Sequence, residues 1–121
     1  MEKSRQIIPK RGEVYLVAFD PAVGAEIKKT RPALVLQNDI GNRYASTTIV
    51  AAITSRKDDE LYPMNVLVRK PEGGLEADST ILLDQVRTID KSRLWKKLGK
   101  CKPETMHRVD DALAISVGLV K

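Results

Sequence analysis

Cysteine and histidine are nearly absent from this chain of 121 residues, which contains one of each, Cys101 and His107. A single cysteine excludes an internal disulfide, as is usual in a reducing cytosol. One cysteine and one histidine also cannot fill the four-ligand shell of a thiolate zinc site, so such a site is excluded. We expect no metal ion and no cofactor. Acid–base catalysis by a pair of histidines within one chain is excluded for the same reason.

Long apolar runs and glycine-rich motifs are missing too. The longest apolar run, Val14 to Phe19, has six residues, far below the roughly 20 needed to cross a bilayer. Residues 1–10 are mixed and polar, without the basic-then-apolar pattern of a secretion leader. The seven glycines are scattered, which excludes a phosphate-binding loop of the Walker or dinucleotide type. We therefore expect a cytoplasmic protein that does not contact a membrane.

The charge balance is basic. The chain has 21 Lys and Arg against 16 Asp and Glu, a net charge of +5. A basic surface gathers polyanions or acidic proteins, although charge alone does not say which. With 42% hydrophobic and 31% charged residues, the chain has the composition of one globular domain. We predict a flexible arm over residues 1–10 and a single domain over 11–121.

Short strands dominate the pattern along the chain. Apolar and β-branched runs bounded by turn signals predict strands over 14–19, 32–36, 47–54, 64–69, 80–83, 86–89 and 94–98. The strand over 47–54 is nearly continuous and apolar, which is typical of a strand covered on both faces. Turns are predicted around 38–42 and 71–74, and a long loop over 22–30.

Only the tail is predicted to be helical. Pro103 suits the first turn of a helix, with Glu104 at the positive end of the helix dipole. Apolar residues then recur every three or four positions up to Val120, which predicts a helix over about 103–119. Many short strands and one final helix indicate a mainly β fold, a small and strongly bent sheet or barrel with a C-terminal α-helix.

Five segments in a fixed order carry a family resemblance. They are RGEVY at 11–15, DP with VG and Glu26 at 20–26, TRPALVLQND at 30–39, TTIVAAIT at 47–54 and DSTILLDQVRTID at 78–90. With this order and spacing, the chain from Arg11 to Leu119 resembles toxins of the MazF/PemK family from type II toxin–antitoxin systems. The resemblance implies a small SH3-like β-barrel of the CcdB/PemK type with a C-terminal helix, working as a homodimer.

The same resemblance implies an activity and a partner. The activity is metal-independent, sequence-specific, ribosome-independent cleavage of single-stranded RNA by an endoribonuclease, or mRNA interferase. The products are a 2′,3′-cyclic phosphate and a 5′-hydroxyl. A cognate antitoxin, MazE-like and acidic, would neutralise the toxin. The family's catalytic pair corresponds to Arg31 and Thr54, and the loop before Arg31 borders the RNA channel in relatives.

The chemistry of Arg31 and Thr54 agrees with that activity. RNA supplies its own nucleophile, the 2′-hydroxyl, so the protein has to hold the phosphate and offset its developing negative charge. The guanidinium of Arg31 is a planar fork of donors suited to two phosphate oxygens. The Thr54 hydroxyl can donate to a phosphoryl oxygen or orient the leaving group. From the residues alone, a structural arginine and an ordinary strand-end threonine remain alternatives.

Further RNA contacts are predicted on the loop and on the strands after it. Lys28 and Lys29 lie beside Arg31, with Glu26 on the same loop, although a solvated loop tip is an equal alternative. Gln85 and Asp84 can read base edges, because single-stranded RNA exposes its pairing faces. Arg87 can add a phosphate contact.

One basic segment has two interpretations. Residues 91–102 hold six basic residues and no acid, with Trp95 among them. In one, the segment makes an extra RNA or antitoxin contact, with Trp95 able to stack on a base. In the other, Trp95 packs in the core beneath the helix while the lysines keep an edge strand from aggregating. We favour the packed tryptophan.

Two other functions fit such a basic barrel: a toxin of the same fold that binds a protein target such as gyrase, and a non-catalytic RNA-binding barrel. Only RNA cleavage accounts for Arg31 and Thr54 at the family's catalytic positions.

Overall fold

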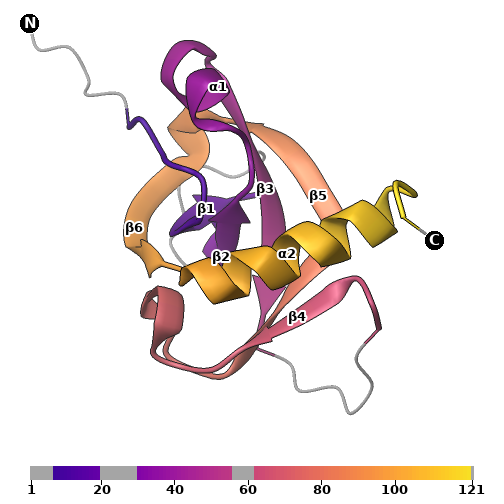
Figure 1. Ribbon diagram of the computed structural model, residues 1–121. Helices are drawn as coiled ribbons and strands as arrows, with labels where there is room; N and C mark the ends of the chain where they lie inside the picture. Colours follow the sequence, from indigo (N-terminus) through magenta and orange to yellow (C-terminus); the bar gives the residue numbers. More distant parts are fainter. Residues whose placement is uncertain (1–6, 20–29, 56–61, 121) are drawn as a thin grey trace, which may run out of the picture.

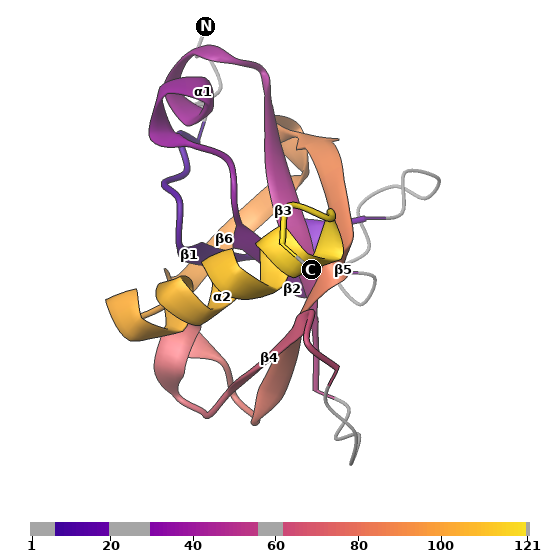
Figure 2. The same cartoon turned by 45° about the vertical axis from the view of Figure 1, so that its right-hand side comes forward.

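The structure, a computed structural model, describes residues 7–19, 30–55 and 62–120, and in these residues one curled antiparallel sheet carries the fold (Figure 1). Its strands are β1 (Glu13–Ala18), β2 (Thr30–Val35), β3 (Thr47–Thr54), β4 (Asn65–Val68), β5 (Ser79–Asp90) and β6 (Leu94–Lys100). They are hydrogen-bonded in the order β4-β5-β3-β2-β1-β6. Helix α2 (Pro103–Ser116) lies across the sheet beside β4 and β5 (Figures 1 and 2). The mainly β fold with a C-terminal helix is confirmed.

Successive side chains of a strand point to opposite faces of the sheet, so the core is divided into two clusters. One cluster lies between the sheet and α2 and includes Leu34, Ala51 and Ile81 from the strands with Val109 from the helix. The other lies on the opposite face of the sheet and includes Val50. Successive residues of β3 therefore enter different clusters, which is why its apolar run is continuous. The prediction that this strand is covered on both faces is confirmed.

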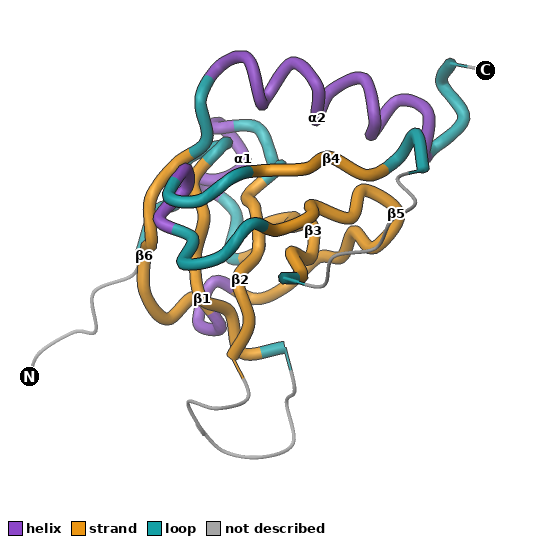
Figure 3. The backbone as a smooth tube through the Cα atoms, turned by 90° about the horizontal axis from the view of Figure 1, so that it is seen from below, coloured by secondary structure: helices purple, strands orange, loops and turns teal. Residues whose placement is uncertain are grey.

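The barrel is not closed by strand pairing. The edge strands β4 and β6 do not pair, and the short 3-10 helix η2 (Glu72–Gly74) packs against β6 instead. The Glu72 carboxylate accepts a hydrogen bond of 2.9 Å from the backbone N–H of Lys102. The backbones of η2 and β6 come so close that a Cβ added to Gly99 would lie 2.6 Å from the carbonyl carbon of Gly73. We call this contact between η2 and β6 the seam; it gives the open sheet its barrel-like shape (Figure 3).

A second helix, α1 (Asp39–Tyr44), lies where the sequence predicts only turns. The prediction missed it because capping, rather than apolar periodicity, defines this short helix. The Asn38 side chain accepts a hydrogen bond of 2.8 Å from the Gly41 N–H at the helix start. Asn42 is fully buried, and its side chain accepts from the Thr48 hydroxyl at 2.7 Å and donates to the Gln37 carbonyl at 2.9 Å. These bonds fix α1 against the start of β3.

Strand β5 also differs from the prediction. The sequence predicts two strands, over 80–83 and 86–89, whereas the structure has one strand of 12 residues. Its pairing with β3 shifts register, from Ala51 opposite Val86 to Ala52 opposite Leu82. Residues 83–85 form the bulge that absorbs the shift, so the polar Asp84 and Gln85 interrupt the hydrophobic pattern without ending the strand.

The described part of the chain begins at residue 7 and ends at residue 120. Within the arm predicted over 1–10, residues 1–6 lie outside the described residues, whereas Pro9 is buried. Helix α2 ends at Ser116, and Gly118 follows with a φ of +79°. Among the described residues, no helix is both long and apolar enough to span a lipid bilayer.

At the start of β1, a buried carboxylate ties three segments together. The Glu13 carboxylate accepts hydrogen bonds from the Lys10 N–H at 2.9 Å and the Tyr15 hydroxyl at 3.0 Å, and pairs with the Lys97 ammonium at 2.9 Å. Burial raises the pKa of Glu13, but the bonds from Lys97, Lys10 and Tyr15 outweigh burial and hold the pKa below its ordinary 4.5. The charged form of Glu13 is therefore the form that stabilises the fold.

We expect the substitution Glu13→Gln to lower the free energy of unfolding at pH 7 by about 1–3 kcal/mol, because it removes charge-assisted hydrogen bonds. A depressed carboxyl pKa contributes stability above the unfolded-state value, about 4.5, and loses it as pH falls through the folded-state value. The difference between wild type and variant should thus shrink below about pH 4.5. Urea unfolding from pH 7 to pH 3 tests this, and a difference that does not change with pH would contradict it.

Candidate active site

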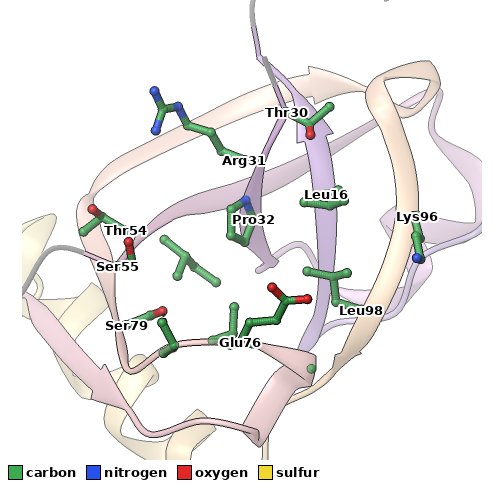
Figure 4. A pocket seen from close by; sticks show the side chains of 14 residues that line it. Leu16, Thr30, Arg31, Pro32, Thr54, Ser55, Glu76, Ser79, Lys96 and Leu98 are labelled. Atoms are coloured by element: carbon green, nitrogen blue, oxygen red, sulfur yellow. Dashed lines mark hydrogen bonds between the residues drawn. The ribbon is translucent and has the colours of Figure 1, made fainter. Parts of the chain in front are cut away.

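A cavity of about 500 Å³ opens where β2 begins and β3 ends (Figure 4). Its lining comes from β2 and β3, from β1 and β6, and from the segment between η2 and β5. The lining residues are Leu16, Thr30, Arg31, Pro32, Ile53, Thr54, Ser55, Gly74, Leu75, Glu76, Ala77, Ser79, Lys96 and Leu98. The curl of the sheet therefore brings residues from five strands, and from the segment between η2 and β5, to a single site.

Arg31 and Thr54, far apart in sequence, both line this cavity. Strands β2 and β3 pair from Val35 opposite Val50 to Ala33 opposite Ala52. The same register, continued by two residues, would bring Arg31 opposite Thr54. The guanidinium of Arg31 reaches to the rim of the cavity on the side where Thr54 lies (Figure 4). Two polar side chains with the donors that a phosphate needs thus line one cavity from two neighbouring strands.

Arg31 is exposed, and its side chain makes no hydrogen bond or ion pair with any described residue. The alternative of a structural arginine tied to a loop carboxylate concerns Glu26 and its neighbours, which lie outside the described residues. An arginine at the rim of a cavity, with its donors bonded to none of the described residues, is suited to binding an anion.

The floor of the cavity is apolar. Leu16 pairs with Pro32 across β1 and β2, so both side chains point to one face of the sheet. Ile53 and Leu98 complete the floor. Because neighbouring residues of a strand point to opposite faces, Arg31 is turned away from the face of Pro32, toward the rim.

The wall opposite Arg31 holds residues that the sequence analysis missed. Glu76 turns its carboxylate into the cavity, and Lys96 on β6 lies at another side (Figure 4). Ser79 is buried, and its hydroxyl donates a hydrogen bond of 2.8 Å to the Ala77 carbonyl, which fixes the turn after Glu76. In the sequence Glu76 is one acid in a polar turn, with nothing to mark it; only the seam between η2 and β6 brings it to the cavity.

The predicted RNA-binding residues fall into two groups, one before β2 in the chain and one on β5. Glu26, Lys28 and Lys29 lie outside the described residues. Asp84, Gln85 and Arg87 are exposed on β5 and do not line the cavity.

Arg87 and Trp95 have surroundings that the sequence did not indicate. The Arg87 guanidinium lies 5.1 Å from the ring centre of Phe19, a cation–π contact. Trp95 is 36% exposed on the edge strand β6 and belongs to neither core cluster. The favoured prediction that Trp95 packs beneath the helix is wrong, because α2 packs on β4 and β5 rather than on β6.

Other chemistry has little support in the described residues. Among them, no three His, Cys, Asp or Glu side chains come together as metal ligands would. Burial raises the pKa of Cys101 to about 11, and the nearby Glu72 adds to the rise. The thiol is therefore protonated at neutral pH, unlike the thiolate of a nucleophilic cysteine.

Comparisons with known proteins agree on one family. Residues 10–117 match the family described as "PemK-like, MazF-like toxin of type II toxin-antitoxin system". The chain is 48% identical over 114 residues to endoribonuclease EndoA of Bacillus subtilis (strain 168), covering 94% of this chain and 98% of the relative.

Solved structures of similar shape include a mycobacterial endoribonuclease in complex with its cognate antitoxin, with a TM-score of 0.77 and 26% identity. They also include MazF from Deinococcus radiodurans, with a TM-score of 0.74 and 26% identity. Each match covers 93% of this chain and 98% of the other.

Proposed function

Because the chain belongs to the PemK-like, MazF-like family of toxins of type II toxin–antitoxin systems, we propose that its cavity cleaves single-stranded RNA. The protein is an endoribonuclease toxin, and the cleavage is sequence-specific, ribosome-independent and independent of metal. The observation that carries the proposal is the meeting of Arg31 and Thr54 at the rim of one cavity.

In the proposed reaction, the ribose 2′-oxygen attacks the adjacent phosphorus. A new bond forms between that oxygen and phosphorus, and the bond from phosphorus to the 5′-oxygen of the next nucleotide breaks. The 2′-hydroxyl gives up its proton, and the departing 5′-oxygen gains one. The products are a 2′,3′-cyclic phosphate and a 5′-hydroxyl.

Arg31 and Thr54 have separate roles in this step. The Arg31 guanidinium binds the phosphoryl oxygens and stabilises the negative charge that grows on them. Arginine has a pKa above about 12, so charge stabilisation rather than proton transfer is its main contribution. The Thr54 hydroxyl donates a hydrogen bond to a phosphoryl oxygen or to the leaving oxygen.

The test is incubation of the protein with a long single-stranded RNA in excess chelator. We expect discrete fragments that end in a cyclic phosphate. Binding without cleavage would favour a passive RNA-binding barrel. Intact RNA together with trapped complexes of DNA and gyrase would favour a protein-binding toxin.

In the same assay, we expect Thr54→Val to slow cleavage on the order of 10²-fold, because valine keeps the shape of threonine but lacks the donor. Thr54→Ser keeps the hydroxyl and should retain most of the rate. Single-turnover rates on one oligonucleotide measure both variants. Equal cleavage rates for the valine and serine variants would show that the Thr54 hydroxyl has no role in the reaction.

The partners follow from the same premise. The protein acts as a cytoplasmic homodimer, and an acidic cognate antitoxin of the MazE type neutralises it. Support comes from the net charge of +5, and from a similar endoribonuclease whose structure was solved with its cognate antitoxin. A monomer mass by sedimentation at micromolar concentration would contradict the dimer.

A further inference from the structure

We infer that the floor of the cavity holds a nucleobase next to the scissile phosphate, and that Glu76 selects a base with an exocyclic amino group. This inference rests on the proposed RNA cleavage and names a specificity-determining residue for it. The observations that carry it are the division of the cavity into a cationic rim and an apolar floor, and the position of Glu76.

The rim and the floor suit different parts of a nucleotide. Arg31 and Thr54 at the rim offer donors, which a phosphate needs. The floor offers apolar side chains, Leu16, Ile53 and Leu98, against which the flat face of a base can pack. At about 500 Å³, the cavity falls in the range of small-ligand pockets, roughly 300–1,000 Å³. With a phosphate at the rim, an adjoining base can therefore reach the floor.

Glu76 gives the pocket its selectivity. Its carboxylate turns into the cavity from the wall opposite Arg31 (Figure 4), and it has no hydrogen-bond or ion-pair partner among the described residues. An ionised carboxylate only accepts hydrogen bonds. It therefore attracts N–H groups, and it repels a phosphate toward Arg31 at the rim.

The bases differ in what they present to such an acceptor. Adenine, cytosine and guanine each carry an amino group that can donate to the carboxylate, as cytosine N4 does to Glu in direct readout. Uracil has a carbonyl oxygen in place of that group. Its one pairing-edge donor, N3–H, lies between two carbonyl oxygens, which would face the carboxylate unfavourably. Lys96, on another wall, only donates and can bind the carbonyl or ring-nitrogen acceptors that these bases also carry. The pocket thus discriminates against uracil.

The experiment compares wild type with Glu76→Gln and with Glu104→Gln. Glu104 is an exposed carboxylate on the first turn of α2, outside the cavity, so its substitution is a matched control. A long RNA is digested by each protein in excess chelator, and the cleavage ends are sequenced. Oligonucleotides that differ only at one position beside the cut then give kcat/KM for each base.

For wild type and Glu104→Gln, we expect one position beside the cut to favour an amino-bearing base over uracil. In Glu76→Gln, this preference should fall about 10-fold or more, because the glutamine amide can also donate to uracil. The change should be a loss of rate on the amino-bearing substrate with uracil cleavage unchanged or faster. Far-ultraviolet circular dichroism checks that the variant is folded.

Two results would overturn the inference. Glu76→Gln with unchanged base preference would show that the carboxylate is only solvated. An equal loss of rate for all four bases would show that the Glu76 carboxylate acts through the electrostatic field of the whole site or through the stability of the fold. Wild-type protein that is folded but leaves RNA intact would instead overturn the proposed function, so the two failures are distinguishable.

Discussion

Replacing Arg31 with alanine is expected to lower the rate of RNA cleavage by at least 10²–10³-fold, the cost of removing one donor aimed at developing charge in a well-studied protease. The loss should exceed that of Thr54→Val, because arginine supplies two donors and a full positive charge. Stability should hardly change, since the Arg31 side chain is exposed and bonds to no described residue. Arg31→Lys keeps the charge but loses the planar fork, so an intermediate rate is expected.

The measurement separates binding from chemistry. Single-turnover cleavage gives the rate, and an RNA with a 2′-deoxy nucleotide at the cut gives affinity without reaction. If Arg31 stabilises the transition state, the rate should fall much more than the affinity. Arg69→Ala is a matched control, because Arg69 is an exposed arginine that does not line the cavity. A loss of cleavage rate no larger than that of Arg69→Ala would show that Arg31 has no role in the reaction.

The sequence predicted what depends on local pattern. Strand β3 has the bounds predicted for it, Thr47–Thr54, because a continuous apolar run ends at polar residues on both sides. Arg31 and Thr54 were identified through the family resemblance, and they reach one cavity because β2 and β3 are neighbours in the sheet. Residues at the ends of neighbouring antiparallel strands come together once the register is fixed.

The parts that the sequence did not predict depend on contacts distant in the chain. Glu76 and Lys96 reach the cavity because the sheet curls until η2 meets β6, and neither position stands out in a polar turn or a basic strand. Helix α1 was missed because its buried Asn42 looks like a turn residue until its hydrogen bonds are known. Trp95 was misplaced because periodicity does not say which strands a helix covers.

Substituting Gly74 with alanine is expected to have the largest effect on stability. Gly74 has a φ of +73°, where an L side chain is strained, and its added Cβ would overlap the backbone carbonyl of Leu98. Backbone atoms on both sides of the seam would have to separate. We expect the free energy of unfolding to fall by about 4 kcal/mol or more, the size of change seen when packing and strain combine.

Gly118→Ala is the matched control for this substitution. Gly118 has a similar φ, +79°, but a Cβ there has open space around it, so only the strain of about 1–2 kcal/mol is expected. Urea unfolding of both variants measures the difference, which is the cost of forcing the seam apart. An equal decrease in the free energy of unfolding for both variants would mean that η2 moves away from β6 at little cost in free energy. In that case the seam would not hold the wall that carries Glu76. A larger loss for Gly74→Ala would tie the stability of the open barrel to the same contact that completes the cavity.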